Sequence, residues 1–324
     1  MNYKDQAVAT IREELKKFDL LYNSIRSENP HLQKMVEYMQ KADGKKIRPT
    51  LLLLTAKALG EVNEMTYHAA VTIELLHTAT LIHDDVVDDS NMRRGQPSLN
   101  SIYDNRKTVL CGDFFLSSAL TQSVLTENLE IVSTISNLGK KLAEGELQQL
   151  VVAEEVIINE EEYFNIIRQK TASLLSACMK IGAITVGADR DTVNKFAELG
   201  ELIGMSVQLL DDIFDYYDDN IGKPTGNDIR EGKITLPLLY AFENTTATDN
   251  QHATAIVQNK DFTEENIAYL IDFAKVNGGI DYTYSILDKT TNKAKELVAN
   301  LNLASKDLTE PFLLLIQYLK ERKY

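Results

Sequence analysis

The sequence predicts an all-α protein, a bundle of long helices, and three observations carry this prediction. In nearly every segment apolar residues recur with the period of a helix, about 3.6 residues, whereas the strict apolar/polar alternation of strands is almost absent. Proline and glycine, which interrupt helices and form turns, are scarce, at 6 and 15 of 324 residues. The segments 69–85 and 201–215 are apolar on nearly every side, which is typical of helices at the centre of a large core.

The helices expected from this periodicity cover most of the chain. In the first half they lie at about residues 3–25, 31–41, 47–59, 65–89, 98–125 and 128–155. In the second half they lie at about residues 161–186, 192–219, 234–243, 263–276, 280–300 and 308–321. Most carry a charged side, so we expect amphipathic helices around the two apolar ones. The polar stretch 244–251 should be a surface loop, and no flexible linker divides the chain, so we expect a single domain over residues 1–324.

The protein is strongly acidic. It has 48 aspartates and glutamates against 34 lysines and arginines, which gives a formal charge of -14 at pH 7. Such a surface repels nucleic acid and anionic membranes, so we expect no nucleic-acid partner and at most peripheral membrane contact. An anionic substrate would need a local remedy, such as metal ions or clustered lysines and arginines.

Cysteine usage and the N-terminal region predict a cytoplasmic protein. Cys111 and Cys178 lie in apolar helical segments and form no disulfide framework, so we interpret them as reduced, buried side chains. Residues 1–20 are charged throughout and lack the apolar stretch of a signal peptide. No apolar run reaches the length of a membrane span, about 18 residues.

Two acidic clusters end the two apolar helices: Asp84, Asp85 and Asp88 in DDVVD, and Asp211, Asp212 and Asp215 in DDIFD. In each cluster the first and last aspartates share a helix face, since residues four apart lie one turn apart. Carboxylates at a helix C-terminus oppose the macrodipole, and like charges that are buried together destabilise the fold unless a cation neutralises them. Solvated helix ends are the alternative interpretation. The apolar spacers and the repetition of the pattern favour a cation site.

The residue types in these clusters indicate Mg²⁺ rather than Zn²⁺. Oxygen ligands without a nearby set of histidines or cysteines suit a hard cation. His83 precedes Asp84 directly, and neighbouring positions do not share a helix face. A di-iron bundle would require Glu-x-x-His pairs, and the segment EGELQQL at 144–150 lacks the histidine.

Basic residues follow or precede the acidic clusters and could bind a polyanion that metal ions bridge. Arg93 and Arg94 come directly after the first cluster and are suited to bidentate binding of a diphosphate. Further candidates are Lys45, Arg48, Lys170, Thr171, Lys223 and Lys233. The alternative for each single lysine is a surface side chain that contributes solubility.

These motifs resemble those of the trans-isoprenyl diphosphate synthases, also called polyprenyl synthetases. The matching segments are GKKIRP at 44–49, HTATLIHDDVVDDSNMRRG at 77–95, GDFF at 112–115, QKT at 169–171, QLLDDIFD at 208–215 and GKITLP at 232–237, with Lys223 before the last. They follow the family's order and spacing over residues 44–237. One departure is Val207, where many relatives carry phenylalanine, and it concerns packing rather than metal chemistry.

The resemblance implies an isoprenoid-synthase bundle around a central cavity, usually a homodimer. It implies Mg²⁺-dependent head-to-tail condensation of isopentenyl diphosphate with an allylic diphosphate. The implied Mg²⁺ ligands are Asp84, Asp88 and Asp211, with Asp215 acting through water and Asp85 and Asp212 as weaker or indirect partners. The implied isopentenyl diphosphate site consists of Lys45, Arg48, His77 and Arg94. The implied allylic site consists of Arg93, Lys170, Thr171, Gln208, Lys223 and Lys233.

Five of these residues are expected to act in catalysis itself: Asp84, Asp88, Asp211, Lys170 and Lys223. His77 is less certain from its position alone, because a histidine in an apolar helix is commonly a core residue. It lies seven residues, or two turns, before Asp84 on the same face, and the resemblance makes it a substrate contact.

Residues that precede the first acidic cluster should form the wall that limits product length. Thr80 and Ala79 lie about one turn before Asp84, and Leu76 lies about two turns before it. In short-chain relatives bulky aromatic residues near the first positions block the growing tail, whereas here they are small. We therefore expect a product of roughly six to ten isoprene units along this helix, with octaprenyl as the first choice.

Three other functions stay open from the sequence. A short-chain farnesyl or geranylgeranyl diphosphate synthase would share all the motifs. A class I terpene cyclase shares the fold, but it generally carries one aspartate-rich motif and would not need the second diphosphate site of Lys45 and Arg48. A non-catalytic subunit of a heteromeric synthase would tend to lose the acidic clusters, and both are intact here.

Overall fold

The computed structural model describes residues 3–41, 44–93, 95–156, 159–217, 225–246, 248, 250–301 and 303–321. In chain order the elements are α1 (Tyr3–Ala9), α2 (Arg12–Tyr22), α3 (Pro30–Lys41), α4 (Ile47–Leu59), α5 (Glu64–Val87), β1 (Met92–Arg93), β2 (Gln96–Pro97), α6 (Leu99–Tyr103), α7 (Asn105–Val124), α8 (Leu129–Glu155), α9 (Glu160–Ile167), the π-helical turn η1 (Arg168–Ala172), α10 (Ser173–Thr185), α11 (Arg190–Phe214), α12 (Asn227–Arg230), α13 (Leu236–Glu243), α14 (Gln251–Gln258), α15 (Glu264–Val276), α16 (Gly279–Ala299), the short 3₁₀ helix η2 (Lys306–Leu308) and α17 (Thr309–Glu321).

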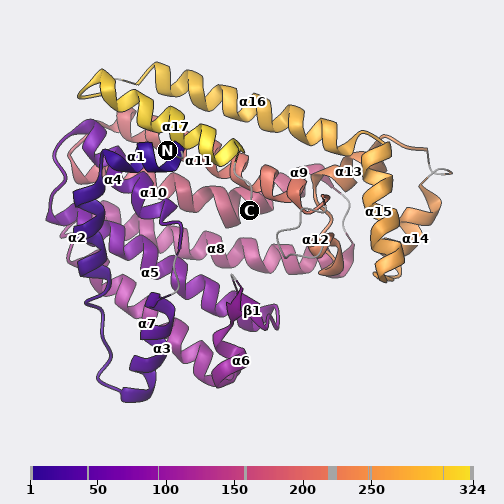
Figure 1. Cartoon of the computed structure of the whole chain (residues 1–324), viewed down its shortest axis with the longest axis horizontal. Coiled ribbons are helices and arrows are strands. Elements are labelled where there is room, and N and C mark those ends of the chain that lie inside the picture. Colours follow the sequence, from indigo (N-terminus) through magenta and orange to yellow (C-terminus); the bar gives the residue numbers. More distant parts are fainter. Residues whose placement is uncertain are drawn as a thin grey trace.

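The all-α prediction is confirmed. Within the described ranges the only strands are β1 and β2, which form an antiparallel pair of two residues each. Helices α5, α8, α10 and α11 run through the middle of the molecule, α16 runs along one long edge, and α14 and α15 form one end (Figure 1). No helix in the part of the chain that is described has both the length and the apolar character needed to cross a bilayer.

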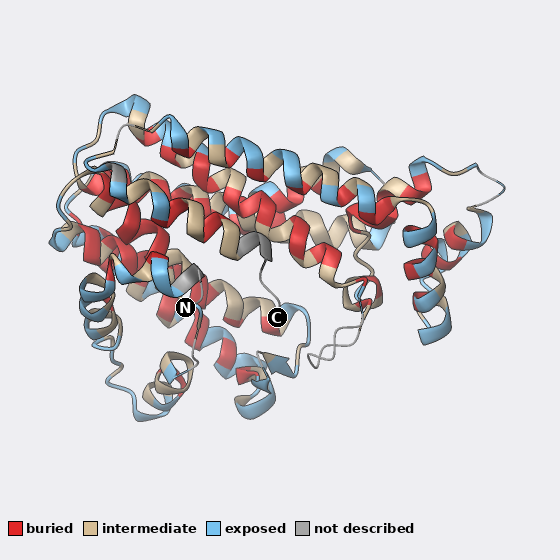
Figure 2. Ribbon diagram, turned by 45° about the horizontal axis from the view of Figure 1, so that its top comes forward, coloured by how far each residue is buried: buried red, intermediate tan, exposed pale blue. Residues whose placement is uncertain are grey.

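The two apolar helices lie at the centre, as predicted. α5 packs against α7 and α4, and α11 packs against α10 and α16. Buried residues gather on these central helices, while the outer helices alternate buried and exposed faces (Figure 2). Because both apolar helices are covered on several sides, the acidic cluster at the end of each is carried by a rigid part of the core.

The start of α5 is fixed by a capping box. The side chain of Asn63 accepts a hydrogen bond from the backbone N–H of Thr66, and the Thr66 hydroxyl accepts one from the backbone N–H of Asn63. The Asn63 amide also donates to the backbone carbonyl of Thr185 at 2.9 Å, where α10 ends. These contacts set the register of α5 against α10, so the aspartates at the far end of α5 have a defined position.

Three hydrophobic clusters hold the helices together. The largest joins α1–α8 with α10, α11, α16 and α17, a second joins α12–α16, and a third packs α9 against α11, α13 and α16. The third cluster includes Tyr163, Leu209 and Leu287, and it lies under the second acidic cluster. That all three belong to a single folding domain stays a prediction.

Several element boundaries differ from the predicted ones. The helix expected at 98–125 is divided at Asp104, whose φ of 89° is incompatible with a continuing helix. The helix expected at 3–25 is divided after Ala9 and ends at Tyr22, and the one expected at 161–186 contains the π-helical turn η1. Periodicity did not predict α12 or α14, because helices of 4 and 8 residues are too short to show it.

Candidate active site

The first acidic cluster ends α5. Asp84 is half-buried, whereas Asp88 is exposed and its backbone N–H donates to the carbonyl of Asp84 at 2.8 Å. Burial, followed by the negative charge of Glu146 on α8, raises the pKa of Asp84 to about 6. Lys170 opposes this shift. The charged form of Asp84 is therefore poorly solvated, and a nearby cation would stabilise it.

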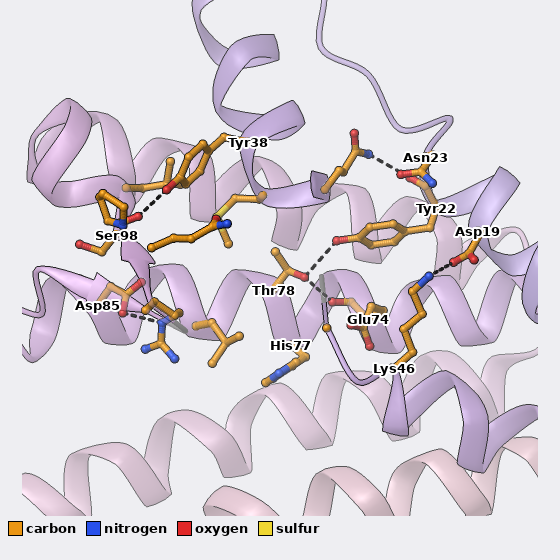
Figure 3. A pocket seen from close by; sticks show the side chains of 18 of the residues that line it. Asp19, Tyr22, Asn23, Tyr38, Lys46, Glu74, His77, Thr78, Asp85 and Ser98 are labelled. Carbon is orange, nitrogen blue, oxygen red and sulfur yellow. Dashed lines mark hydrogen bonds and ion pairs between the residues drawn. The ribbon is translucent and has the colours of Figure 1, made fainter. Parts of the chain in front are cut away.

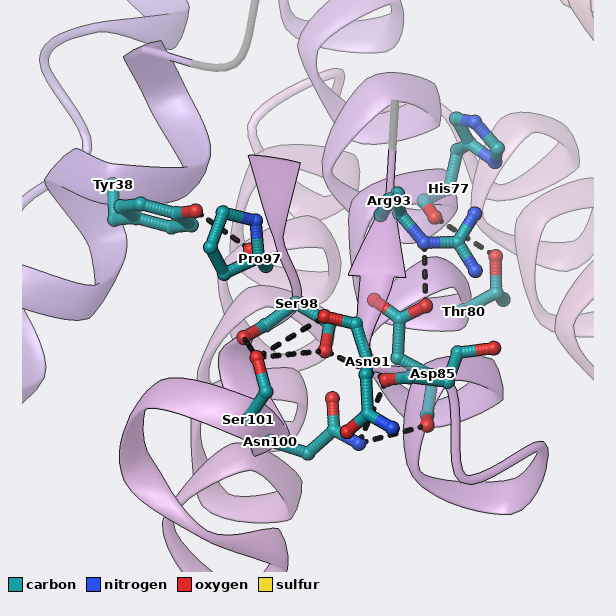
Figure 4. Close-up of polar contacts among 11 residues, drawn as sticks. Tyr38, His77, Thr80, Asp85, Asn91, Arg93, Pro97, Ser98, Asn100 and Ser101 are labelled. Atoms are coloured by element: carbon teal, nitrogen blue, oxygen red, sulfur yellow. Dashed lines mark hydrogen bonds and ion pairs between the residues drawn. The ribbon is translucent and has the colours of Figure 1, made fainter. Parts of the chain in front are cut away.

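Asp85 lies differently from its two neighbours. Its side chain is 4% exposed and accepts a hydrogen bond from Nε of Arg93 at 2.6 Å. Burial raises the pKa of Asp85, and the guanidinium of Arg93 offsets part of that increase. Asp85 thus points to the β1–β2 hairpin, as Figure 4 shows, and acts as the anchor of Arg93.

The hairpin itself is held by backbone carbonyls that accept side-chain hydrogen bonds. The Ser98 hydroxyl donates to the carbonyl of Ser90 at 2.6 Å, and the Ser101 hydroxyl donates to that of Asn91 at 3.2 Å (Figure 4). From α3, the Tyr38 hydroxyl donates to the carbonyl of Pro97 at 2.6 Å. These bonds hold the hairpin in place and so fix the position of the Arg93 backbone on β1. Arg94, a predicted substrate contact, lies outside the described residues.

The second acidic cluster ends α11, and its members have separate roles in the fold. Asp211 is half-buried. Asp212 is 1% exposed and accepts hydrogen bonds from the Tyr163 hydroxyl at 2.5 Å and the Gln208 amide at 2.8 Å. Asp215 accepts hydrogen bonds from two backbone N–H groups at the start of α12, those of Asn227 at 2.9 Å and Asp228 at 3.0 Å. Asp212 therefore joins α11 to α9, and Asp215 joins it to α12.

Lys170 and Thr171 lie on the π-helical turn η1, a local distortion that often marks functional sites. Lys170 forms an ion pair with Glu146 at 2.5 Å and donates a longer hydrogen bond to Gln149 at 3.3 Å. Thr171 donates to the amide oxygen of Gln208 at 2.8 Å. The turn thereby presents one cation and one hydroxyl toward α8 and α11.

Two glycines allow η1 to lie this close to its neighbours. A Cβ atom at Gly204 on α11 would come within 2.5 Å of the Cα atom of Ala172, and one at Gly145 on α8 would come within 2.9 Å of Gln169 Cβ. Real Cβ atoms essentially never come within 3.0 Å of another heavy atom, and both distances are shorter than that. The turn therefore fits between α8 and α11 because both positions lack a side chain.

One cavity of 170 Å³ brings five predicted site residues together: Lys170, Thr171, Gln208, Asp212 and Lys233. Apolar side chains from α8, α9 and α13, among them Val152, Ile166 and Leu239, line the rest of it. Burial would lower the pKa of Lys233, but Glu231, Asp88 and Asp228 outweigh burial and raise it. Lys233 therefore interacts electrostatically with the first cluster through Asp88 and with the surroundings of the second through Asp228.

A second cavity of 280 Å³ lies between α5, α2, α3 and the hairpin (Figure 3). The predicted residues His77, Asp85 and Arg93 line it, and His77 is 7% exposed. Lys46 lines it as well and forms an ion pair with Asp19 at 2.7 Å.

Other predicted residues do not line these cavities. Lys45 is exposed, and Arg48 is half-buried and close enough to Cys178 to interact with it electrostatically. Lys223 lies outside the described residues. Of the chain-length residues, Ala79 and Leu76 are each 2% exposed and belong to the main core, whereas Thr80 is half-buried.

Sequence reasoning missed three residues of this site. Glu146 pairs with Lys170, Tyr163 holds Asp212, and Asp228 lies beside the second cluster with a pKa raised to about 7 by burial and then by Asp215. Glu146 lies in the segment EGELQQL, whose pattern alone does not indicate a partner for Lys170. Tyr163 gave no signal, because it is 49 residues from its partner in sequence.

The donors at this site fit a hard divalent cation. They are carboxylate oxygens, and Asp84 is partly buried with a raised pKa, so a cation would stabilise its charged form. Among the residues that the structure describes, no three acidic, histidine or cysteine side chains converge as a preformed metal site. Mg²⁺ is usually held by one or two carboxylates, while substrate phosphates and water complete its coordination.

Comparison with known proteins identifies the family. The sequence profile of the polyprenyl synthetases matches residues 29–274. The chain belongs to the polyprenyl synthetase family. Octaprenyl diphosphate synthase of Escherichia coli strain K12 is 34% identical to it over 260 residues, which cover 79% of this chain and 80% of that protein. The predicted resemblance and the predicted prenyltransferase activity, synthesis of polyprenyl diphosphates, are confirmed.

Solved structures of similar proteins agree with this family assignment. A geranylgeranyl pyrophosphate synthase from Bacteroides thetaiotaomicron is 39% identical with a TM-score of 0.84, covering 97% of this chain and 98% of that one. A polyprenyl synthase from Caulobacter crescentus, whose structure is complexed with calcium and isoprenyl diphosphate, is 28% identical with a TM-score of 0.91, covering 99% and 98% of the two chains. The fold is thus that of this prenyltransferase family.

We predict that Gly204→Ala destabilises the protein and lowers activity by displacing η1. The added Cβ meets backbone rather than a flexible side chain, so we expect a loss of about 1–3 kcal/mol in the free energy of unfolding. Urea unfolding measures this loss. The control is Gly139→Ala on α8, where the added Cβ has no neighbour within 4 Å. That change should stabilise by about 0.5–1 kcal/mol through helix propensity. Equal effects at both positions would contradict the account of η1.

Proposed function

We propose that this polyprenyl synthetase catalyses Mg²⁺-dependent, head-to-tail condensation of isopentenyl diphosphate with an allylic diphosphate. The observation that carries the proposal is the 170 Å³ cavity, which combines Lys170, Lys233, Thr171 and Gln208 with an apolar wall next to the second acidic cluster. Cations and hydroxyls suit the diphosphate, and the apolar wall suits the isoprenoid chain.

Asp84 and Asp88 from α5 and Asp211 from α11 would hold Mg²⁺, with Asp215 acting through water. When bound, Mg²⁺ supplies Lewis-acid neutralisation of the negative charge that develops on the departing diphosphate. Asp85 would contribute indirectly, because its carboxylate orients Arg93.

Lys170 and Lys233 each form an ion pair with a glutamate, which orients their ammonium groups before an anion binds. Lys170 is paired with Glu146 at 2.5 Å and Lys233 with Glu231 at 2.6 Å. An incoming diphosphate replaces these single carboxylates with several oxygens, so both cations gain contacts when the allylic substrate binds. Arg93 uses Nε for Asp85, and the terminal nitrogens of its guanidinium are oriented by that bond. We assign these three cations to the allylic diphosphate, together with Lys223.

The second substrate would bind through Lys45, Arg48, His77 and Arg94. The carbon–oxygen bond of the allylic diphosphate ionises to an allylic cation, the double bond of isopentenyl diphosphate attacks that cation, and one proton then leaves the new chain. We assign that proton to the released diphosphate, because no side chain of the predicted site is an obvious base. Ile166, Val152 and Leu239 in the cavity wall exclude water, which would otherwise react with the allylic cation.

The product should be of medium to long chain, roughly six to ten isoprene units along α5, with octaprenyl as the first choice. The small residues Ala79 and Thr80 before Asp84 support this length. A short-chain product is the second candidate, since the similar structure from Bacteroides thetaiotaomicron is that of a geranylgeranyl pyrophosphate synthase.

The active form should be a homodimer in which α7 faces a second copy of the chain. Four apolar side chains recur along one face of α7 and are exposed: Val109 (38%), Leu116 (36%), Leu120 (46%) and Val124 (64%). Their spacing of seven, four and four residues forms a helical stripe, which suits packing against another helix.

The metal assignment predicts that Asp84→Asn combined with Asp211→Asn abolishes turnover while the fold is kept. We expect kcat to fall at least about 1,000-fold, because neither cluster could then neutralise the diphosphate. The assay uses the purified chain with Mg²⁺, farnesyl diphosphate and labelled isopentenyl diphosphate. Asp89→Asn, an exposed aspartate at the same helix end, is the matched control and should leave kcat unchanged. Near-normal turnover in the double variant would refute the assignment.

The chain-length proposal predicts a graded response along α5. Ala79→Tyr and Thr80→Phe should block the tail about one turn from Asp84, and Leu76→Phe about one turn further, roughly 5.4 Å deeper. Products separated by chain length should therefore be shortest for the first two variants and longer for the third. An unchanged product distribution in all three variants would place the wall elsewhere.

The dimer proposal predicts that Leu120→Glu combined with Val124→Glu yields monomers. Two charges on the stripe would have to be buried without partners, which disfavours association. Light scattering after size-exclusion chromatography reports the mass. Leu20→Glu on α2, a leucine that is 75% exposed outside the stripe, is the control and should stay dimeric. A wild-type chain that elutes as a monomer would contradict the proposal.

A further inference from the structure

A continuous chain of hydrogen bonds connects α9 to the allylic site. The Tyr163 hydroxyl donates to one oxygen of Asp212 at 2.5 Å, and the Gln208 amide donates to the other at 2.8 Å. The Gln208 carbonyl oxygen in turn accepts a hydrogen bond from Thr171 at 2.8 Å. Thr171, Gln208 and Asp212 already belong to the predicted site, whereas Tyr163 has no assigned role.

We propose that Tyr163 is a positioning residue for the prenyl transfer, which acts through Asp212 and Gln208 to orient Thr171 at the allylic site.

The direction of each bond follows from chemistry. The Tyr163 hydroxyl and the NH₂ group of Gln208 are the donors, and each donates a hydrogen bond to a different oxygen of Asp212. With its NH₂ group held by Asp212, the amide of Gln208 can offer Thr171 only its oxygen. Thr171 must then donate its single proton to Gln208, and its hydroxyl oxygen remains an acceptor toward the cavity.

Burial makes this chain depend on Tyr163. Tyr163 is 7% exposed and Asp212 is 1% exposed, so no bulk solvent replaces a lost donor. Without the phenol, Asp212 would keep only the Gln208 amide as a donor, and its carboxylate could rotate. That rotation would displace the side chains of Gln208 and Thr171.

Helix α9, which carries Tyr163, is anchored independently of this chain. The side chain of Asn159 caps the helix by accepting from the backbone N–H of Glu162 at 3.1 Å. Tyr282 on α16 donates to Glu160 at 2.9 Å. Tyr282 therefore offers a matched comparison, since it is a second tyrosine that donates to a carboxylate at α9 but has no bond to Asp212.

The test compares Tyr163→Phe with Tyr282→Phe, each of which removes one hydroxyl and keeps the ring. We expect Tyr163→Phe to lower kcat by about 10- to 100-fold, because it removes a buried hydrogen bond to a charged group. The KM for isopentenyl diphosphate should stay within about twofold, since the residues assigned to that substrate do not belong to the chain of bonds. Tyr282→Phe should keep kcat within about twofold of the wild type.

Two results would overturn the proposal. One is a kcat for Tyr163→Phe that equals that of Tyr282→Phe. The other is a rise in the KM for isopentenyl diphosphate that parallels the loss of kcat, which would indicate a general structural defect. Wild-type turnover in the same assay keeps either result separate from failure of the proposed function.

A double-mutant cycle tests whether Tyr163 acts through Asp212. In an Asp212→Asn background, Tyr163→Phe should lower kcat by less than about twofold further, because the charged acceptor is already lost. Fully additive losses would contradict the route through Asp212. Should Tyr163→Phe fail to fold, Asp212→Asn decides by itself. A kcat loss of similar size with an unchanged KM for isopentenyl diphosphate supports the proposal, and an unchanged kcat overturns it.

Discussion

The fold places negatively charged side chains where burial and helix dipoles destabilise them, and nearby cationic side chains offset part of that cost. Carboxylates end two long central helices, α5 and α11, at the helix termini whose dipoles also repel them. Burial, followed by the negative charge of Glu146, raises the pKa of Asp84 to about 6. Because water has little access to the buried carboxylates, cations must stabilise their negative charge. The protein supplies three such cations itself, Lys170, Lys233 and Arg93.

Within each cluster the aspartates differ in burial and in their hydrogen-bond partners. Asp85 and Asp212 are almost fully buried and are committed to protein donors, Arg93 for the first and Tyr163 with Gln208 for the second. Their neighbours Asp84 and Asp211 are half-buried. The second aspartate of each motif thus holds neighbouring side chains in place, which gives the doubled acidic pattern a structural reason of its own.

The sequence was sufficient for the parts of this account that depend on local pattern. The period of apolar residues predicted the long helices, and spacing of four residues placed the aspartates on one helix face. Contacts that depend on distant packing were not accessible. Tyr163 approaches Asp212 only because α9 packs on α11, and Lys170 depends on a π-helical turn that Gly145 and Gly204 admit. The break at Asp104 was missed because one positive φ interrupts an otherwise regular helical pattern.

The central claim is that the two acidic clusters bind Mg²⁺ together with a diphosphate rather than as a preformed site. Calorimetric titration of the purified chain with Mg²⁺, in the absence and presence of inorganic diphosphate, tests this most directly. The account predicts weak Mg²⁺ binding without diphosphate and binding at least about tenfold tighter with it, since phosphate oxygens complete the coordination. Equal Mg²⁺ affinity under both conditions would contradict it.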